Sequence, residues 1–337
     1  MKWVNAMLTI YEIYLKLLNI IDVFGIDKLQ ILKELELLMA PVVDEIIAVD
    51  ERYLVYHKKG SKERILLTAS IADPYVFVVK QIMNEGLIEF SELYNRLLPS
   101  FIIGTKVKFQ NGVIGVIYTK FKDSIAGNIS FISADKLYID IGVYNCSVAK
   151  THLHIGDCAI INGLSYEQLK NRITGPHLSV LITTALLLKT IKIFGDFATD
   201  LYFIISSNSK HDLGDLIKNI VPDYIINIET YTIEDFNSNK HEQLIKSGKG
   251  PIIEYPQINK YLSNFTEMIC QTANENGINI QRLFLAPSEK SKKCESTIRI
   301  PIFHALSATE IVDNTDVDKL LNLLQCIIFK IQREGHL

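Results

Sequence analysis

Serine and histidine side chains occur at spacings that could serve nucleophilic catalysis. Ser179 follows His177 by two residues, Ser209 precedes His211 by two, and Ser70 ends an apolar run. A serine hydroxyl becomes an effective nucleophile when a neighbouring base such as imidazole takes its proton. One hypothesis is therefore a hydrolase in which these serines act with His177 or His211 as base.

The histidine and cysteine pattern gives little support for a metal site. His152 and His154 would face the same side of a strand, but a pair without a third ligand is more typical of a strand surface. The five cysteines are an odd number without a CxxC pair, which indicates reduced thiols in a cytosolic protein. We therefore predict no cysteine-rich zinc site, and no chemical role for Cys146 or Cys158.

The charge balance argues against polyanionic partners. Lys and Arg number 35 against 38 Asp and Glu, for a net charge of −3. Such a chain has no global positive field to hold a phosphate backbone or an anionic membrane. We predict no nucleic-acid partner and no membrane partner.

The length and apolar content predict a globular protein of more than one small module. The chain has 337 residues, of which 48% are hydrophobic and 22% charged, enough to bury a large core. The N-terminus predicts an amphipathic helix rather than a signal peptide or a membrane span, because charged residues interrupt each apolar stretch. Its apolar face is formed by Val4, Met7, Leu8, Tyr11, Leu15, Leu18 and Ile21. We expect a cytoplasmic location.

Strand and helix patterns alternate at both ends of the chain. A helix is predicted over Lys28 to Met39, two short strands within VVDEIIAVDERYLVYHKKG, and one buried strand in ERILLTASIADPYVFVVK. From Leu178 onwards, strand patterns such as LYFIIS and YIINIET alternate with helical ones, ending in a helix over Asp316 to Arg333. This alternation predicts a mostly parallel sheet with helices on both faces.

The middle of the chain has a different residue pattern. From Tyr75 to Ile161, short β-branched runs alternate with glycines, a spacing typical of a small antiparallel barrel. We therefore predict an α/β domain formed by residues 1–72 and 166–337, interrupted by an all-β barrel domain at 73–165.

Several segments, taken in order, resemble the dinuclear zinc aminopeptidases of the glutamyl and deblocking type, which form tetrahedral particles. The most specific strings are SGKGPII and ENGINIQ. VVDEIIAVDERYLVYHKKG, ILLTASIAD, KLYIDIGVYN, HIGDCAII, RITGPHL, PDYIINIET and ALSATEIV accompany them at plausible distances. The resemblance spans nearly the whole chain and implies a phosphorylase/hydrolase-like α/β sheet with an inserted dimerisation barrel. It also implies two zinc or cobalt ions held by oxygen and imidazole ligands beside a carboxylate base.

The side chains at the corresponding metal positions depart from that chemistry. The histidine and aspartate of the family's first metal strand fall at Ser70 and Ala72, and its bridging aspartate falls at Ser179. The general base falls at Ser209, and the neighbouring glutamate ligand falls at Lys210. We interpret the three serines as small residues that fill a vacated pocket, with a serine nucleophile as the alternative.

Two further metal positions complete the set. A later acidic ligand falls at Glu229, which keeps a carboxylate, and the last histidine falls at Leu306. His304 stands two residues earlier, and in an extended segment it would lie roughly 7 Å from the required place. Lys210 beside Glu229 could form an ammonium–carboxylate pair across the vacated site.

The resemblance therefore favours a degenerate, metal-free relative with no cofactor. Our first interpretation is a noncatalytic homologue, or pseudoenzyme, that acts as a binding or assembly subunit with itself or with an active aminopeptidase relative. The alternative is a peptide or amide hydrolase with an unaligned metal site or a new nucleophile. A third is a sensor that binds a ligand in the vacated cleft, where Lys210 and Arg172 would bind a carboxylate through charge-assisted hydrogen bonds. Glu229 and His304 are further candidate ligand-binding residues.

Overall fold

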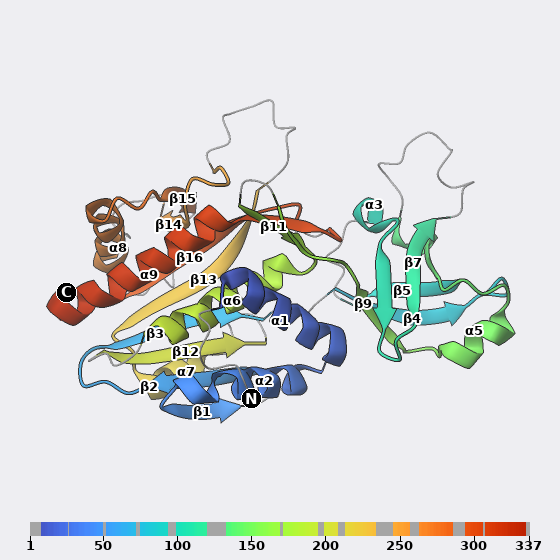
Figure 1. Cartoon of the computed structure of the whole chain (residues 1–337), viewed down its shortest axis with the longest axis horizontal. Coiled ribbons are helices and arrows are strands. Elements are labelled where there is room, and N and C mark those ends of the chain that lie inside the picture. The colour runs from blue at the N-terminus through green and yellow to red at the C-terminus, as the bar shows by residue number, and fades with distance from the viewer. Residues whose placement is uncertain are drawn as a thin grey trace.

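The computed structural model describes most of the chain, in segments separated by short gaps. The described residues are 8–25, 27–49, 52–71, 75–93, 99–119, 133–168, 171–194, 199–207, 213–233, 245–256, 263–285, 294–305 and 307–334. Figure 1 shows a large sheet with its helices at one end of the molecule and a β-barrel at the other.

Two helices open the described chain, as the periodicity predicts. Helix α1 spans Ile10–Phe24 and helix α2 spans Lys28–Met39. The Thr9 side chain caps the first turn of α1, and Glu12 bonds back to the Thr9 backbone, a reciprocal arrangement that satisfies two otherwise unpaired N–H groups. The capping residues explain why α1 begins at Ile10.

The large sheet has eleven strands. Nine of them follow the order β1-β2-β12-β3-β13-β16-β17-β11-β10, and β14 and β15 extend from β16. Their bounds are β1 Glu45–Val49, β2 Tyr53–Lys58, β3 Arg64–Ser70, β10 Tyr166–Gln168, β11 Arg172–Gly175, β12 Asp200–Ser206, β13 Tyr224–Ile233, β14 Ile252–Pro256, β15 Gln281–Leu285, β16 Glu295–Phe303 and β17 Glu310–Asp313.

The sheet is mixed, so the prediction of a mostly parallel sheet is wrong for its flanks. The central strands β12, β3, β13 and β16 are parallel neighbours, whereas β1-β2, β2-β12, β16-β17, β17-β11 and β11-β10 are antiparallel. Short connections join several of these antiparallel pairs, and a parallel pair needs a longer crossover. The helix–strand alternation thus correctly predicts parallel pairing for the central strands only.

Helices cover both faces of the sheet, as predicted. Helices α1, α2, α6 (Leu178–Ile193), α8 (Asn264–Glu275) and α9 (Asn314–Glu334) share one apolar core with the sheet. Helix α7 (Gly214–Ile220) packs on the opposite face against Val55, Leu66, Ile204 and Ile225. Helix α6 is buried along most of its length, which makes it the central helix of this domain.

The predicted all-β insertion is a closed barrel with strand order β4-β5-β8-β7-β6-β9. The strands span β4 Val76–Ile82, β5 Ile88–Glu92, β6 Lys106–Phe109, β7 Ile114–Thr119, β8 Leu137–Asp140 and β9 Cys158–Ile161. Two short helices, α3 (Pro99–Ile102) and α5 (Cys146–His152), accompany them. A separate apolar core that includes Phe77, Phe109 and Ile139 fills the barrel.

The prediction of a single buried strand in ERILLTASIADPYVFVVK is wrong. The segment forms β3 in the large sheet and β4 in the barrel. Both strands are apolar, so their pattern reads as one strand, but the chain passes between them from the core of the sheet to the core of the barrel. The exact division at residues 73 and 165 stays a proposal. Among the described residues, no helix combines the length and apolarity needed to cross a bilayer.

Candidate functional site at the carboxyl ends of the central strands

The carboxyl ends of the central parallel strands bring several predicted site residues to one level of the sheet. Ser70 of β3 pairs with Ser206 of β12, and Glu229 of β13 pairs with Arg299 of β16. The β3–β13 pairing ends at Thr68 and Asn227, two residues before Ser70 and Glu229. In open α/β sheets, ligands bind outside these carboxyl ends, so this edge is the candidate site.

The start of helix α6 brings Ser179 to the same edge. The Thr230 hydroxyl donates to the Ser179 carbonyl at 3.2 Å, and Thr230 directly follows Glu229. Farther along α6, the Thr183 and Thr184 hydroxyls each lie 3.3 Å from the Ser70 carbonyl. The structure therefore joins the segments of Ser70, Ser179 and Glu229 through α6.

Glu310, which the sequence reasoning did not select, meets Ser179 at this helix start. Its carboxylate accepts hydrogen bonds from the Ser179 N–H at 2.5 Å, the Ser179 hydroxyl at 2.7 Å and the Tyr75 hydroxyl at 2.9 Å. Glu310 is fully buried. A carboxylate is favoured at a helix N-terminus because the unpaired N–H groups give that end a partial positive charge. The geometry is that of a helix cap supplied by a distant strand.

The geometry at Ser179 and His177 differs from the one that serine–imidazole catalysis needs. The His177 side chain is fully buried, its Nε2 lies 3.3 Å from the Ile161 carbonyl, and its ring lies 5.5 Å from that of Tyr75. The Ser179 hydroxyl instead donates to a carboxylate. Ser209 and His211 lie outside the described residues, so that pair stays a hypothesis.

His304 does not lie in an extended segment, which corrects the geometry assumed for it. Strand β16 ends at Phe303, and His304 has a φ of 53°. Its carbonyl accepts hydrogen bonds from the N–H and hydroxyl of Ser307, which close a turn. The displacement of roughly 7 Å between His304 and the expected ligand position assumed an extended segment and therefore does not apply.

Arg172 and His304 both lie near the Phe303 ring. The Arg172 guanidinium lies 5.8 Å from the ring centroid and the His304 ring 6.2 Å from it. The Nε of Arg172 also lies 3.8 Å from the carboxylate of Asp313. Since Phe303 stands four residues beyond Arg299 on β16, these two candidates lie roughly 13 Å along the strand from the Glu229 level.

Glu229 has an ion-pair partner that the sequence reasoning missed. Arg299 Nη2 lies 2.8 Å from Glu229 Oε2, and Arg299 Nε lies 2.5 Å from Glu254 Oε1. The predicted partner of Glu229, Lys210, lies outside the described residues. Among the described residues, Arg299 of β16 is a cation that pairs with Glu229, and the pair with Lys210 stays a prediction.

The residues at the expected metal positions do not fit a dinuclear zinc centre. Ser70 and Ser179 offer hydroxyls, and the Glu229 carboxylate is bound to a guanidinium. Ala72, Ser209, Lys210 and Leu306 lie outside the described residues, but by residue type alanine and leucine carry no side-chain donor atom and lysine carries a positive charge. Within the described segments, no group of three or more His, Cys, Asp or Glu is arranged to hold a metal ion.

His152 and His154 are not strand residues, contrary to the prediction. His152 ends helix α5, and His154 belongs to a turn in which its N–H donates to the Asp157 carboxylate. The alternation that would place both rings on one side therefore does not apply.

The SGKGPII string forms a tight loop around a buried carboxylate. The N–H groups of Gly248 and Gly250 donate to Asp316 at 2.7 and 2.6 Å. Burial raises the pKa of Asp316 to about 6, although these two hydrogen bonds partly offset the shift. This loop ties the β14 strand to the first turn of α9.

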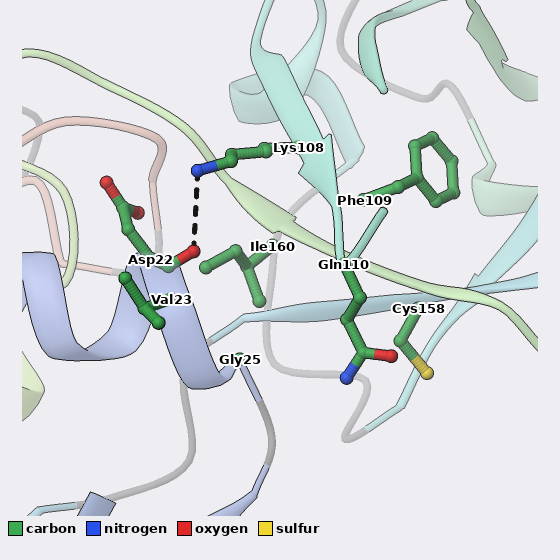
Figure 2. Close-up of a pocket in the computed structure, with 8 residues that line it drawn as sticks. All are labelled: Asp22, Val23, Gly25, Lys108, Phe109, Gln110, Cys158 and Ile160. Carbon is green, nitrogen blue, oxygen red and sulfur yellow. Dashed lines mark hydrogen bonds between the residues drawn. The ribbon is translucent and has the colours of Figure 1, made fainter. Parts of the chain in front are cut away.

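A small pocket lies where the end of α1 meets the barrel. Figure 2 shows Lys108 of β6 directed at the Asp22 carbonyl, with a distance of 3.5 Å from Nζ to O. Gln110 and Cys158 line the other side, and the volume of about 10 Å³ matches one water site. The pocket is too small for a substrate, and its position makes it part of the junction between barrel and sheet.

Comparison with known proteins agrees with this architecture. The family model described as M42 glutamyl aminopeptidase matches residues 53–291, which is more than half of the chain. The chain belongs to the M42 glutamyl aminopeptidase family.

Individual relatives of the M42 chain support the same fold. A protein of Acetivibrio thermocellus named "Putative aminopeptidase" is 25% identical over 302 residues, covering 84% of this chain and 87% of its own. The TET aminopeptidase of the marine sediment archaeon Thaumarchaeota archaeon SCGC AB-539-E09 superimposes with a TM-score of 0.78 at 19% identity, covering 98% of each chain. The TET1 peptidase of Pyrococcus horikoshii gives 0.71 at 20% identity, covering 94% of this chain and 98% of its own.

The site residues that sequence reasoning missed in this M42 chain are Glu310, Arg299 and Glu254. Glu310 is 131 residues from Ser179, and Arg299 is 45 residues from Glu254. No local spacing connects such pairs. The sequence signal that could identify Arg299 and Glu254 is a charged residue inside an apolar strand pattern, as in IRIPIF and IIEYP. A half-buried charge in such a strand needs a partner.

Proposed function

We propose that this M42 family member is a noncatalytic homologue of the aminopeptidases that acts as a binding or assembly subunit. The observation that carries the proposal is the ion pair between Glu229 and Arg299 at 2.8 Å. Glu229 is the only expected ligand position that keeps a carboxylate, and here that carboxylate is bound by a guanidinium. The other expected positions hold Ser70, Ala72, Ser179, Lys210 and Leu306, and the base position holds Ser209.

The activity test uses aminoacyl anilides with acidic, basic and apolar residues, each with added Zn²⁺, Co²⁺ or Mn²⁺. We expect no turnover above a buffer control. Turnover that a chelator abolishes would overturn the noncatalytic proposal and favour a metal-dependent hydrolase. Elemental analysis of the purified protein is the parallel test, in which we expect well under one equivalent of transition metal per chain.

The alternative of a peptide or amide hydrolase with a new nucleophile has one supporting observation. The Ser179 hydroxyl donates to the buried Glu310 carboxylate at 2.7 Å. The same carboxylate also accepts the Ser179 N–H and the Tyr75 hydroxyl, which suits a structural cap better than a base that must take a proton. Chelator-resistant turnover lost in Ser179→Ala would favour the hydrolase.

The assembly role implies self-association, at least to a dimer. The Pyrococcus horikoshii TET1 peptidase can assemble into a tetrahedron or a large octahedral shell. In this chain, large apolar side chains on and beside the barrel strands are exposed, namely Phe101, Ile114, Val116, Tyr144 and Ile155. Contiguous apolar patches mark interaction sites, and we propose that self-association covers these side chains.

Light scattering coupled to gel filtration tests the assembly proposal. A mass near that of one chain, 38.3 kDa, would contradict self-association. We expect at least twice this mass. A larger particle formed only on mixing with an active M42 aminopeptidase would indicate a heteromeric assembly instead.

A further inference from the structure

Three charged side chains form a compact cluster beside the candidate site. Arg299 binds Glu229 through Nη2 at 2.8 Å and Glu254 through Nε at 2.5 Å. Its Nη2 also contacts Glu254, and its Nη1 lies 3.3 Å from the Thr230 carbonyl. All three nitrogens of the guanidinium are therefore used by protein oxygens.

The cluster is largely shielded from water. The side chains of Arg299 and Glu229 are each 24% exposed, and that of Glu254 is 22% exposed. Two carboxylates held this close repel each other, and their repulsion is screened less when water is scarce. A cation between them offsets this repulsion, and Arg299 supplies one from the protein itself.

The oxygen atoms around Arg299 would otherwise suit a divalent metal ion. Two carboxylates and one main-chain carbonyl converge on the guanidinium. Hard oxygen donors of this kind favour ions such as Mn²⁺. The guanidinium of Arg299 instead places a protein cation among these oxygens.

We infer that Arg299 is an internal cation that occupies the place of a divalent metal ion between Glu229 and Glu254 and prevents this carboxylate pair from binding metal. The inference rests on the proposed noncatalytic function, because it explains how the vacated site is stabilised without a cofactor. Arg299 is the residue that competes with a metal ion for the Glu229 and Glu254 carboxylates.

The central test removes the cation and measures binding of the metal alone. Arg299→Met keeps most of the side-chain length without the charge. Titration with Mn²⁺, followed by the electron paramagnetic resonance signal of the free ion, should show one saturable site at least tenfold tighter than in the wild type. A second change, Glu254→Gln in the same chain, should remove that gain, because one carboxylate is lost.

Matched controls separate this effect from loss of structure or general charge change. Arg299→Lys keeps a cation and should stay as weak a Mn²⁺ binder as the wild type. Arg282→Met removes an arginine that stacks on Tyr255 at 5.1 Å and should not change Mn²⁺ binding. Tight Mn²⁺ binding by the wild type, or a folded Arg299→Met that gains none, would overturn the inference.

If Arg299→Met alone does not fold, the inference still makes a decisive prediction. Mn²⁺, or the added Glu254→Gln change, should restore a cooperative unfolding transition, since either relieves the carboxylate repulsion. Failure of both would refute the role assigned to Arg299. Aminopeptidase activity through metals held elsewhere would overturn the proposed function without changing these binding results, so the two failures are distinguishable.

Discussion

The carboxylate of Glu310 accepts both the N–H and the hydroxyl hydrogen of Ser179, at 2.5 and 2.7 Å. These residues are 131 positions apart, and the Tyr75 hydroxyl at the entry to the barrel donates to the same carboxylate. One buried side chain thus connects strand β17, the first turn of α6 and the passage into the barrel.

We predict that Glu310→Ala lowers the free energy of unfolding by about 3–5 kcal/mol, because each buried donor left unpaired costs about 1–3 kcal/mol. Glu310→Gln, which can still accept a hydrogen bond, should cost less. Urea unfolding monitored by circular dichroism is the measurement. Ser179→Ala removes one donor of the set and should cost only about 1 kcal/mol. A Glu310→Ala protein as stable as the wild type would show that the cap is dispensable.

The sequence predicts the local parts of this fold well. The periodicity of Lys28 to Met39 gives the bounds of α2, and the predicted change to helix–strand alternation at Leu178 coincides with the first residue of α6. Both segments carry a strong apolar signal that tertiary packing does not override. The glycine-punctuated region likewise yields the closed barrel.

The candidate site is less predictable because its contacts are non-local. Nothing near Arg299 in the sequence identifies Glu229 and Glu254 as its partners, since the pairing depends on strand order across the sheet. His304 leaves the strand through a positive φ, which a non-glycine residue adopts rarely. Strand alternation therefore gives the wrong orientation at this position.

The buried Asp316 predicts a specific pH dependence of stability. Its side chain is fully buried, and its pKa is raised from 3.8 to about 6. A raised pKa means that the folded protein binds this proton more tightly than the unfolded chain does. The stabilisation is fully present below about pH 3.8 and is lost as pH rises through about 6, by roughly 3 kcal/mol.

Asp316→Asn should remove this contribution. The difference in unfolding free energy, wild type minus variant, should fall as pH is raised from about 4 to 7, as followed by urea unfolding at each pH. Asp215→Asn is the control, because its exposed side chain has a pKa lowered by Lys218 and does not titrate in this window. A constant difference between wild type and Asp316→Asn would contradict the raised pKa.

Gly250 is predicted to tolerate no side chain. It has a φ of 108°, and an added Cβ would lie 1.9 Å from the Asn279 carbonyl oxygen. Gly250→Ala should therefore cost well over the roughly 1 kcal/mol of an unfavourable φ alone. Gly104→Ala is the matched control, since Gly104 has a φ of 82° with no atom within 4 Å of its added Cβ. Equal losses of thermal stability in the two variants would rule out the close contact as the cause.

Lys108 is predicted to stabilise the end of α1 from the barrel. The last turn of α1 has no basic residue of its own, and the Lys108 ammonium lies 3.5 Å from the Asp22 carbonyl in that turn. A cation at a helix C-terminus typically contributes about 0.3–1 kcal/mol. Lys108 also offsets part of the burial that raises the pKa of Asp22.

Lys108→Met should therefore lower the stability of the protein by about 0.5–1 kcal/mol and raise the pKa of Asp22 further. Hydrogen exchange should quicken at the amides of the last turn of α1 more than elsewhere in the helix. Lys106→Met changes an exposed lysine on the same strand, two residues earlier, and should leave that exchange unchanged. If both variants quicken exchange equally, the effect is one of general charge, and the specific contact between barrel and helix has no stabilising role.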